Sequence, residues 1–340
     1  MFEELSDSYI PKNVLHRGNQ TNKLKTTFDN FRKFNTASNL LCQGGTGSGK
    51  TVCVNKIIQE ESFNNNYIYV NAAYCKTSNE IFKKLFKLNY NTNRLLSEGI
   101  GILKANRKIL VIDEVNKVKD LFSFFNDLNL IYRETNCPII LISNNRLLID
   151  EMPEDARKTL FFDKVEFPPY NYIELENILL DRVTILKDKY NLSPINIEDI
   201  KRICALGTKD GSARSIFIIA FKCILANDFS EHRIEEILYS IKKEEWFEWV
   251  NRMNSLEKRF LSTLLDINKK TITPSDIFKL MEDLTPQRIS QLITAFINYG
   301  VLEYTYISGG RGKGRYRLLR FAYSDLPDKL HRIALEHNIL

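Results

Sequence analysis

A glycine-rich stretch carries the residues whose chemistry is clearest from the sequence. It consists of Gly44, Gly45, Thr46, Gly47, Ser48, Gly49, Lys50 and Thr51. In this pattern the glycines let the backbone curl until its N–H groups point inward at a β-phosphate, the lysine reaches the β- and γ-oxygens, and the threonine hydroxyl ligates Mg²⁺. The stretch therefore predicts that the chain binds ATP or ADP together with Mg²⁺.

The residues on either side of this loop fit the same interpretation. Leu40 to Cys42 is an apolar run typical of a buried strand, and Val52 to Glu61 has the periodicity of an amphipathic helix. A helix that begins at the loop turns the positive end of its dipole toward the anion. A glycine turn that arose by chance would lack this context.

Two acidic residues, Asp113 and Glu114, follow the apolar run Ile109 to Ile112. We expect Asp113 to hold Mg²⁺ through water and Glu114 to orient or deprotonate the water that attacks the γ-phosphate. Acidic residues at the end of an apolar strand are usually only solvated. The phosphate-binding pattern upstream is what favours a catalytic interpretation, and it predicts a weak, Mg²⁺-dependent ATPase.

Two further polar residues are candidates for contacts with the γ-phosphate. Asn144 follows the apolar run Ile139 to Ile142, and an amide at that position can position water beside the Asp113 strand. Arg214 opens a later helix and can reach the phosphates across a cleft. The alternatives are a turn-forming asparagine and a solvated charge.

The composition limits the class of protein. The 340 residues are 44% hydrophobic, which is ordinary for a globular protein of two or three domains. No apolar run approaches the ~20 residues that span a bilayer, and the acidic start, Met1 to Glu4, is unlike a signal peptide. We therefore expect a cytoplasmic, nucleoid-associated protein with no membrane partner.

The cysteines and the charges add two expectations. Six cysteines occur singly, with no Cys-x-x-Cys pattern, as expected of buried reduced thiols: Cys42, Cys53, Cys75, Cys137, Cys204 and Cys223. The net charge of +6 is concentrated near the C-terminus, since residues 252–340 hold 14 Lys and Arg against 9 Asp and Glu. Basic residues without acidic ones between residues 311 and 320 favour a polyanionic partner.

The order of apolar runs predicts an α/β fold for the first 167 residues. Short strands at Tyr67 to Val70 and Val165 to Phe167 join those already named, and helix-length segments separate them. Continuously apolar strands are typical of a parallel sheet covered on both faces. Pro168-Pro169 then ends this nucleotide-binding domain.

Two further domains are expected beyond the prolines. Residues 168–250 show helical periodicity and predict a small helical domain, with helices at Tyr172 to Tyr190, Ile197 to Leu206, Ser212 to Ala226 and Glu231 to Trp249. Residues 251–340 predict three helices, at Leu256 to Ile267 and after the caps Thr273-Pro274 and Thr285-Pro286, and then two strands, Val301 to Ile307 and Tyr316 to Phe321. That order is typical of a winged helix, whose helix Pro286 to Tyr299 would enter a major groove.

The C-terminal domain is therefore predicted to bind double-stranded DNA. Phosphate contacts are expected from the residues of the glycine-tipped hairpin, and base contacts from the start of the recognition helix. The first group is Arg311, Lys313, Arg315 and Arg317, and the second is Gln287, Arg288, Ser290 and Gln291. The alternative is that the hairpin is a solvated tip.

In this order the elements resemble the AAA+ ATPases, and more narrowly the archaeal origin-recognition and cell-division-control initiators, over nearly the whole chain. Ser8-Tyr9-Ile10-Pro11 with His16-Arg17 resembles that family's nucleotide-base segment. Phe167-Pro168-Pro169-Tyr170 with Arg182 resembles its junction into the lid. The resemblance implies that Pro11, His16, Arg17, Tyr170 and Arg182 bind the nucleotide, that Asn144 and Arg214 are its two sensors, and that residues 308–317 form its winged-helix hairpin.

The chain departs from that family in two places. Family members carry Arg-Val-Lys-Ser-Ser-Leu before the junction, including an arginine near the neighbouring subunit's ATP, whereas this chain has Asp155 to Leu160, with Arg157 offset by two positions. The insertion that touches DNA in the family corresponds to Asn89 to Leu103, which is shorter than usual and holds one basic residue, Arg94.

The sequence thus predicts an ATP-dependent DNA-binding initiator that recognises replication origins, helps to load the replicative helicase and self-associates on DNA. Two other functions fit the same motifs. One is a AAA+ regulator of transposition or plasmid maintenance, which would coat DNA without sequence preference. The other is a signalling ATPase whose winged helix docks proteins.

Overall fold

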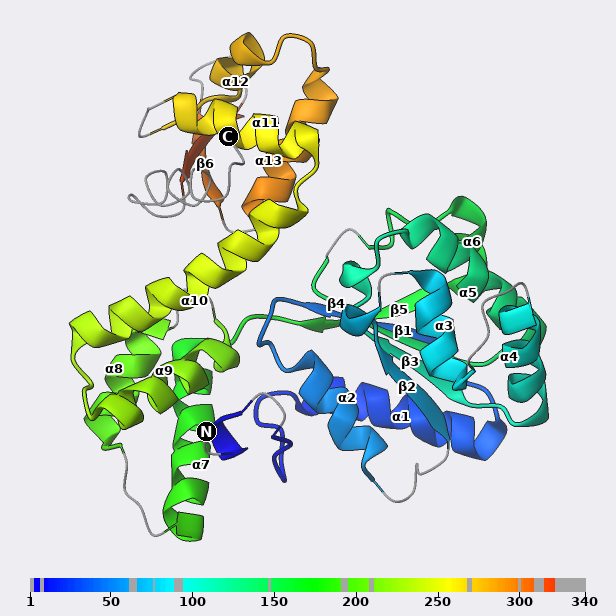
Figure 1. Ribbon diagram of the computed structural model, residues 1–340. Coiled ribbons are helices and arrows are strands. Elements are labelled where there is room, and N and C mark those ends of the chain that lie inside the picture. Colours follow the sequence, from blue (N-terminus) through cyan, green and yellow to red (C-terminus); the bar gives the residue numbers. More distant parts are fainter. Residues whose placement is uncertain are drawn as a thin grey trace. The chain divides into compact units, whose positions relative to one another are not determined.

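Five short apolar strands form the parallel sheet at the centre of the first part of the chain (Figure 1). They are β1 (Asn39–Gly44), β2 (Tyr67–Asn71), β3 (Ile109–Asp113), β4 (Ile139–Ser143) and β5 (Phe162–Phe167). Their order in the computed structural model is β2-β3-β4-β1-β5, and every pair is parallel. The carboxyl ends of β3, β4 and β1 therefore meet at one edge, where the phosphate-binding residues, Glu114 and Asn144 follow.

Helices cover both faces of this sheet, as the continuously buried strands predict. Against one face, α1 (Gly18–Phe34) and α2 (Lys50–Ile58) bury residues such as Phe28 and Val54. The other face packs against α3 (Ser78–Phe86), α4 (Arg94–Ala105), α5 (Leu121–Thr135) and α6 (Glu154–Leu160). Phe82 and Phe124 stack there with their ring centroids 5.9 Å apart. The predicted α/β fold with a parallel sheet is confirmed.

Among the described residues between β5 and Arg252, the regular elements are all helices. They are α7 (Tyr172–Tyr190), α8 (Ile197–Gly207), α9 (Ala213–Ala226) and α10 (Glu231–Arg252). Ser212 caps α9 by accepting a hydrogen bond from the Ser215 N–H at 3.3 Å. Contacts group the chain into two units, Met1–Leu238 and Tyr239–Leu340, so α10 begins in the first unit and ends in the second.

The second unit has the elements of a winged helix. Its helices are α11 (Ser255–Asp266), α12 (Pro274–Leu280) and α13 (Pro286–Asn298), and its strands β6 (Leu302–Ser308) and β7 (Arg315–Phe321) are antiparallel. Capping boxes start α11 at Asn254 and α12 at Thr273. In its core the rings of Phe260 and Phe296 pack edge to face, with their centroids 4.8 Å apart. The predicted helix–helix–helix–hairpin order is confirmed.

Several predicted bounds were wrong by two or three residues, and two elements show why. The helix after the phosphate loop begins at Lys50, two residues before the predicted Val52, and ends at Ile58 rather than Glu61, because residues of the motif itself form its first turn. β5 starts at Phe162, three residues before the predicted Val165, because its first residues alternate between buried and exposed and so hide the strand from a search for apolar runs.

The structure describes residues 3–6, 9–60, 66–75, 77–88, 94–145, 148–190, 195–207, 211–267, 271–298, 301–308 and 315–321. Within these ranges all six cysteines are buried free thiols, as predicted. No helix in the described part of the chain is both long and apolar enough to cross a membrane.

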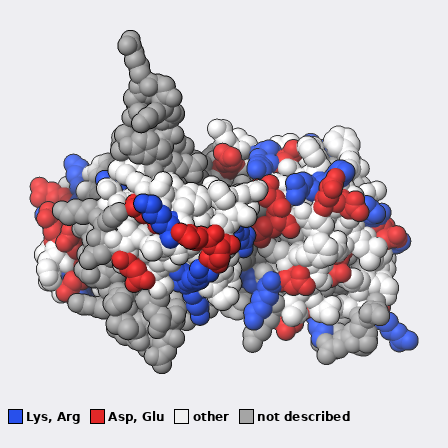
Figure 2. All heavy atoms as spheres, turned by 90° about the horizontal axis from the view of Figure 1, so that it is seen from above, with Lys and Arg blue, Asp and Glu red and all other residues white. Residues whose placement is uncertain are grey.

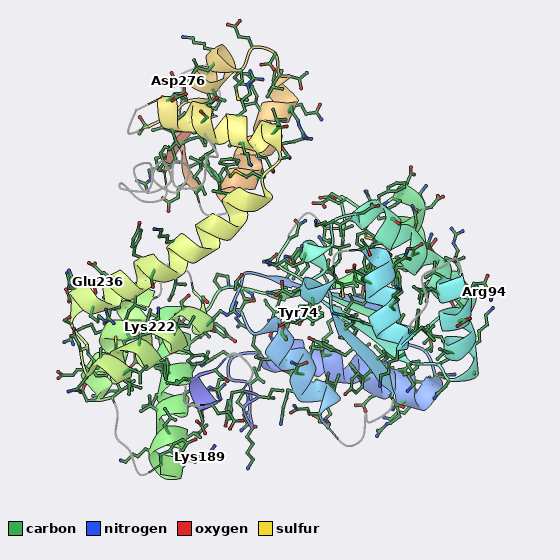
Figure 3. All side chains as sticks on the ribbon, viewed as in Figure 1. Tyr74, Arg94, Lys189, Lys222, Glu236 and Asp276 are labelled. Carbon is green, nitrogen blue, oxygen red and sulfur yellow. The ribbon has the colours of Figure 1, made fainter. Side chains whose placement is uncertain are left out.

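Charged side chains are mixed on the face of the molecule seen in Figure 2. There the described Lys and Arg side chains lie among Asp and Glu side chains and do not form separate positive and negative patches. The one basic residue of the predicted DNA-contacting insertion, Arg94, is exposed at the start of α4 (Figure 3). The opposite side of α4 is buried, through Leu95, Gly99 and Leu103.

Candidate nucleotide-binding site

The glycine-rich loop joins β1 to α2 and curls around the ammonium group of Lys50. Lys50 Nζ donates to the carbonyl oxygens of Gly44 at 2.8 Å and of Gly45 at 2.7 Å. Gly47 and Gly49 have φ angles of +71° and +90°, a backbone conformation that L side chains rarely adopt. Burial lowers the pKa of Lys50, and the carboxylates of Glu114 and Asp113 counteract that shift. The loop thus holds a buried cation among inward-facing polar groups.

Asp113, at the end of β3, is 1% exposed and accepts three hydrogen bonds. Its Oδ2 accepts from the hydroxyls of Thr51 at 2.9 Å and Tyr69 at 3.0 Å, and its Oδ1 accepts from the Glu114 N–H at 2.8 Å. Burial raises the pKa of Asp113, while the bonds from Thr51 and Tyr69 lower it. An oxygen-only donor set of a hydroxyl beside a carboxylate fits Mg²⁺.

Glu114 and Asn144 lie at the same edge of the sheet, at the ends of the neighbouring strands β3 and β4. Glu114 has a φ of +55°, which is uncommon for a residue other than glycine. Asn144 is exposed, and its backbone N–H donates to Asn116 Oδ1 at 3.4 Å. The structure therefore brings both predicted residues to the edge that carries the phosphate loop.

The loop also touches the start of α9. The Gly47 carbonyl accepts a hydrogen bond from the Ala213 N–H at 3.2 Å. A Cβ added at Gly47 would lie 2.1 Å from Ser212 Oγ, so a glycine is needed for this approach as well as for its φ. Arg214, on the first turn of α9, lines the pocket beside Gly47. The sequence did not predict that the loop and α9 meet through their backbones.

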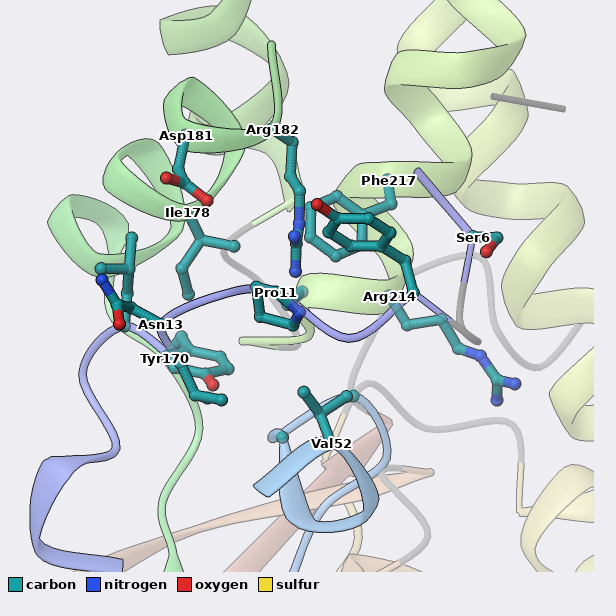
Figure 4. A pocket seen from close by; sticks show the side chains of 16 residues that line it. Ser6, Pro11, Asn13, Val52, Tyr170, Ile178, Asp181, Arg182, Arg214 and Phe217 are labelled. Carbon is teal, nitrogen blue, oxygen red and sulfur yellow. The ribbon is translucent and has the colours of Figure 1, made fainter. Parts of the chain in front are cut away.

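A pocket opens beside the loop, and its walls come from the N-terminal segment, α2, α7 and α9 (Figure 4). Most of its lining is apolar or aromatic, and includes Pro11, Val14, Val52, Tyr170, Ile178 and Phe217. A mainly apolar hollow with a few polar groups is typical of a site for a planar organic ligand. Pro11 and Tyr170 are predicted nucleotide-binding residues, whereas Val14, Val52 and Phe217 were not predicted for this site.

Arg182 brings a buried charge to this pocket. It is 6% exposed, and its guanidinium lies 4.5 Å from the centre of the Tyr9 ring. Figure 4 shows it extending from α7 toward Pro11. Nε and Nη1 have no hydrogen-bond partner among the described residues. Burial lowers the pKa of Arg182, and the neighbouring Asp181 and Tyr9 raise it.

Arg17 and His16 lie just outside the pocket lining. Arg17 is 2% exposed and donates to the carbonyl oxygens of Ser48 at 2.9 Å and Pro168 at 2.6 Å. Its guanidinium also stacks on Tyr170, 3.7 Å from the ring centre. His16 is exposed, and its Nε2 lies 3.3 Å from Asn177 Nδ2. Arg17 therefore links Ser48 of the phosphate loop to Pro168, which lies just before helix α7.

The remaining predicted residues are not among those that line this pocket. Arg157, on α6, is exposed and donates to the carbonyl oxygens of Asp150 and Met152, both at 3.2 Å. On α13 the predicted base-reading residues are all exposed, and Arg288 Nη1 donates to Gln291 Oε1 at 2.9 Å. Outside the described residues lie Ser8, Asn89 to Asn93, Tyr299, Arg311 and Lys313, and the side chains of Arg315 and Arg317 are not described.

Comparison with known proteins gives a family match in the first part of the chain and relatives along nearly all of it. Residues 37–176 match the family model of an AAA domain. An ORC1-type DNA replication protein of Thermoplasma volcanium is 23% identical, with 92% of this chain and 85% of that protein covered. ORC1-type DNA replication protein 2 of Thermoplasma acidophilum is also 23% identical, with 98% of this chain and 90% of that protein covered.

Solved structures share the fold over the full chain. The ORC1 protein of Aeropyrum pernix in complex with DNA aligns with a TM-score of 0.64 at 17% identity, covering 99% of this chain and 96% of that one. The ORC2 protein of the same organism, in ADPNP-ADP complexes, aligns with a TM-score of 0.66 at 15% identity, covering 100% and 99%. The resemblance predicted from the sequence is confirmed.

Proposed function

We propose that this chain, a distant member of the ORC1/Cdc6-type family of archaeal AAA+ proteins, is an ATP-dependent initiator that recognises replication origins and helps to load the replicative helicase. The observation that carries the proposal is the hydrogen bond between Gly47 of the phosphate loop and Ala213 of α9. It connects the nucleotide site to the helices that lead along the chain into the winged helix. The relatives are replication proteins, and one aligned structure contains DNA.

In this proposal Lys50 binds the β- and γ-phosphates, and Glu114 activates water for slow hydrolysis. Mg²⁺ would be held by Thr51 and, through water, by Asp113, and it would neutralise charge on the phosphates. The apolar pocket would hold the base, with Arg182 donating to an acceptor on its edge. Asn144 and Arg214 would contact the γ-phosphate and report its presence.

ATP would act as a switch. We assign residues 1–167 to a nucleotide-binding domain, 168–250 to a helical lid and 251–340 to the DNA-binding winged helix. The phosphate loop and α9 share a hydrogen bond. A change in the shape of the loop on binding the γ-phosphate would therefore shift the position of α9 and of the lid that contains it. The angle between the ATPase core and the winged helix would follow. Self-association on DNA would accompany this change, in a cytoplasmic protein bound to the nucleoid.

The DNA contacts belong to the second unit. Exposed Arg288 and Gln291 on α13 are available to read base edges, and the basic hairpin would bind phosphates. The apolar face of α13 packs Ile289, Leu292 and Phe296 into the core and so fixes the polar face outward.

A footprint across chromosomal DNA, made with and without ATP, tests the proposal. Discrete protected sites that depend on ATP are expected of an origin-recognising initiator. Continuous protection without sequence preference would instead indicate a regulator of transposition or plasmid maintenance. No protection at any protein concentration would favour a signalling ATPase whose winged helix docks proteins.

A further inference from the structure

Tyr69 makes a contact that the mechanism above does not use. It lies on β2, two residues before the end of that strand, and its hydroxyl donates to Asp113 Oδ2 at 3.0 Å. β2 and β3 pair in parallel with Tyr69 opposite Val111, so the ring must lean along the strand to reach the carboxylate two positions further on. Long aromatic side chains can reach such a diagonal neighbour.

This contact fills the second acceptor position of Asp113 Oδ2. Oδ2 has two lone pairs, and the hydroxyls of Thr51 and Tyr69 each take one, while Oδ1 accepts from the Glu114 N–H. Donors from three different elements therefore fix both the plane and the rotation of the Asp113 carboxylate. A cation held by Thr51 would meet an Oδ2 whose lone pairs are already occupied, so a water bound to that cation would donate to the second acceptor position of Oδ1.

We propose that Tyr69 is a positioning residue for Mg²⁺: it holds Asp113 in the orientation that accepts a hydrated Mg²⁺ beside Thr51. The inference rests on the proposed nucleotide function and deepens it. Groups that orient a ligand of a metal in this way typically change the metal affinity by roughly 10- to 100-fold. Since the contact between Asp113 and Mg²⁺ runs through water, we expect the lower end of that range.

The test is a Mg²⁺ titration of nucleotide binding, with ADP as the probe and the full-length chain throughout. Tyr69→Phe keeps the ring, which packs against the cluster of α1, α2 and the sheet, and removes only the hydroxyl. We expect the Mg²⁺ concentration at the midpoint to rise roughly tenfold, while ADP affinity in excess EDTA stays at the parental value. Thermal unfolding without ligand checks that the variant is folded.

Tyr67→Phe is the matched control. Tyr67 lies on the same strand and packs against the same cluster, but it pairs with Ile109, at the opposite end of β3 from Asp113. Its Mg²⁺ midpoint should equal that of the parent.

Three outcomes would overturn the role of Tyr69. They are a Tyr69→Phe midpoint that is unchanged, one that is lower, and an equal loss of ADP affinity with and without Mg²⁺. The last would show that the hydroxyl supports the fold or the nucleotide instead of the metal. A parent protein that does not bind ADP would overturn the proposed function and this inference together.

A double variant gives an independent test of the same role. In an Asp113→Ala background, Tyr69→Phe should have no further effect on the Mg²⁺ midpoint, and an additive effect would also contradict the proposal.

Discussion

The two units hold their candidate functional residues in opposite ways. In the first, Lys50 and Asp113 are 9% and 1% exposed, and each makes two or more hydrogen bonds to its neighbours. In the second, Gln287, Arg288 and Ser290 are exposed on the outer face of a helix whose inner face forms the core. A site built on buried, hydrogen-bonded charges suits a small ligand with fixed stereochemistry. An exposed polar helix suits a large partner that supplies its own surface.

This difference predicts how substitutions act. A change in the first unit alters a network in which removing one partner leaves another buried group unsatisfied, so single substitutions should have large effects. A change on the exposed face of the second unit removes one contact from many, so single effects should be small and dependent on the DNA sequence.

Lys50→Ala is expected to have the largest effect, because it removes the buried cation around which the loop curls. We expect nucleotide binding to fall below detection by calorimetry with ADP or ATP. Lys56→Ala, a lysine on the last turn of the same helix, is the control and should bind as the parent does. If Lys50→Ala bound nucleotide within tenfold of the parental affinity, the expectation of large single-substitution effects in the first unit would be contradicted.

Glu114→Gln should separate binding from turnover. The amide keeps the size of the side chain but cannot accept a proton from water, so ATP hydrolysis should fall by about 10²- to 10⁴-fold. Nucleotide affinity should stay close to the parental value, because Glu114 is not a phosphate ligand. Steady-state phosphate release measures this, with exposed Glu98→Gln on α4 as the control. Hydrolysis at the parental rate would remove Glu114 from the catalytic site.

Replacing Arg311, Lys313, Arg315 and Arg317 together by alanine tests the second unit. If three of them contact phosphates, the slope of log affinity against log salt should flatten by about 3. Binding should weaken alike on every DNA sequence. Fluorescence anisotropy over a range of salt concentrations measures the slope, and Lys279→Ala, an exposed lysine on α12, should leave it unchanged. A four-alanine variant with the parental slope would favour the protein-docking alternative.

Arg288→Ala should have the smallest effect. If Arg288 reads a guanine edge, its loss should cost about 1–3 kcal/mol on a preferred site and much less on unrelated DNA. The two DNAs in one competition assay provide the control. Equal losses on both would show that Arg288 contacts the backbone, which would sharpen the view of this helix as a general binding surface.

The sequence predicted the strands well, because buried parallel strands are short, apolar and separated by polar turns. β2, β3 and β4 each start at the predicted residue and extend one residue further. β5 begins earlier than predicted, because Asp163 and Lys164 interrupt its apolar pattern at the edge of the sheet. Continuously apolar strands are thus easier to predict from polarity than a strand whose apolar residues are interrupted by charged ones.

The candidate site was only partly predictable. The phosphate loop and the Asp113-Glu114 pair follow from local motifs, whose residues are neighbours in the chain. The contacts Gly47–Ala213, Arg17–Pro168 and Tyr69–Asp113 join residues between 44 and 166 positions apart. No local pattern encodes them, since they depend on how the strands are ordered and where α9 packs. One feature of the sequence could have pointed to Tyr69. Alternate residues of a strand face the same side of the sheet, so Tyr69 lies on the same face as Asn71, the last residue of its strand.

The buried cysteines give the first unit an intrinsic chemical reporter. Cys42 and Cys53 lie in the core of the sheet, whereas Cys204 and Cys223 lie in α8 and α9, and the last cysteine of the chain is Cys223. Burial raises the pKa of Cys53 to about 11 and that of Cys204 to about 12, so the reactive thiolate is scarce in the folded state. Alkylation rates resolved by peptide mass would therefore time the opening of the sheet and of the helical part separately. Reagent added with ADP would show which of the two the nucleotide closes, without any label and with no signal from the winged helix.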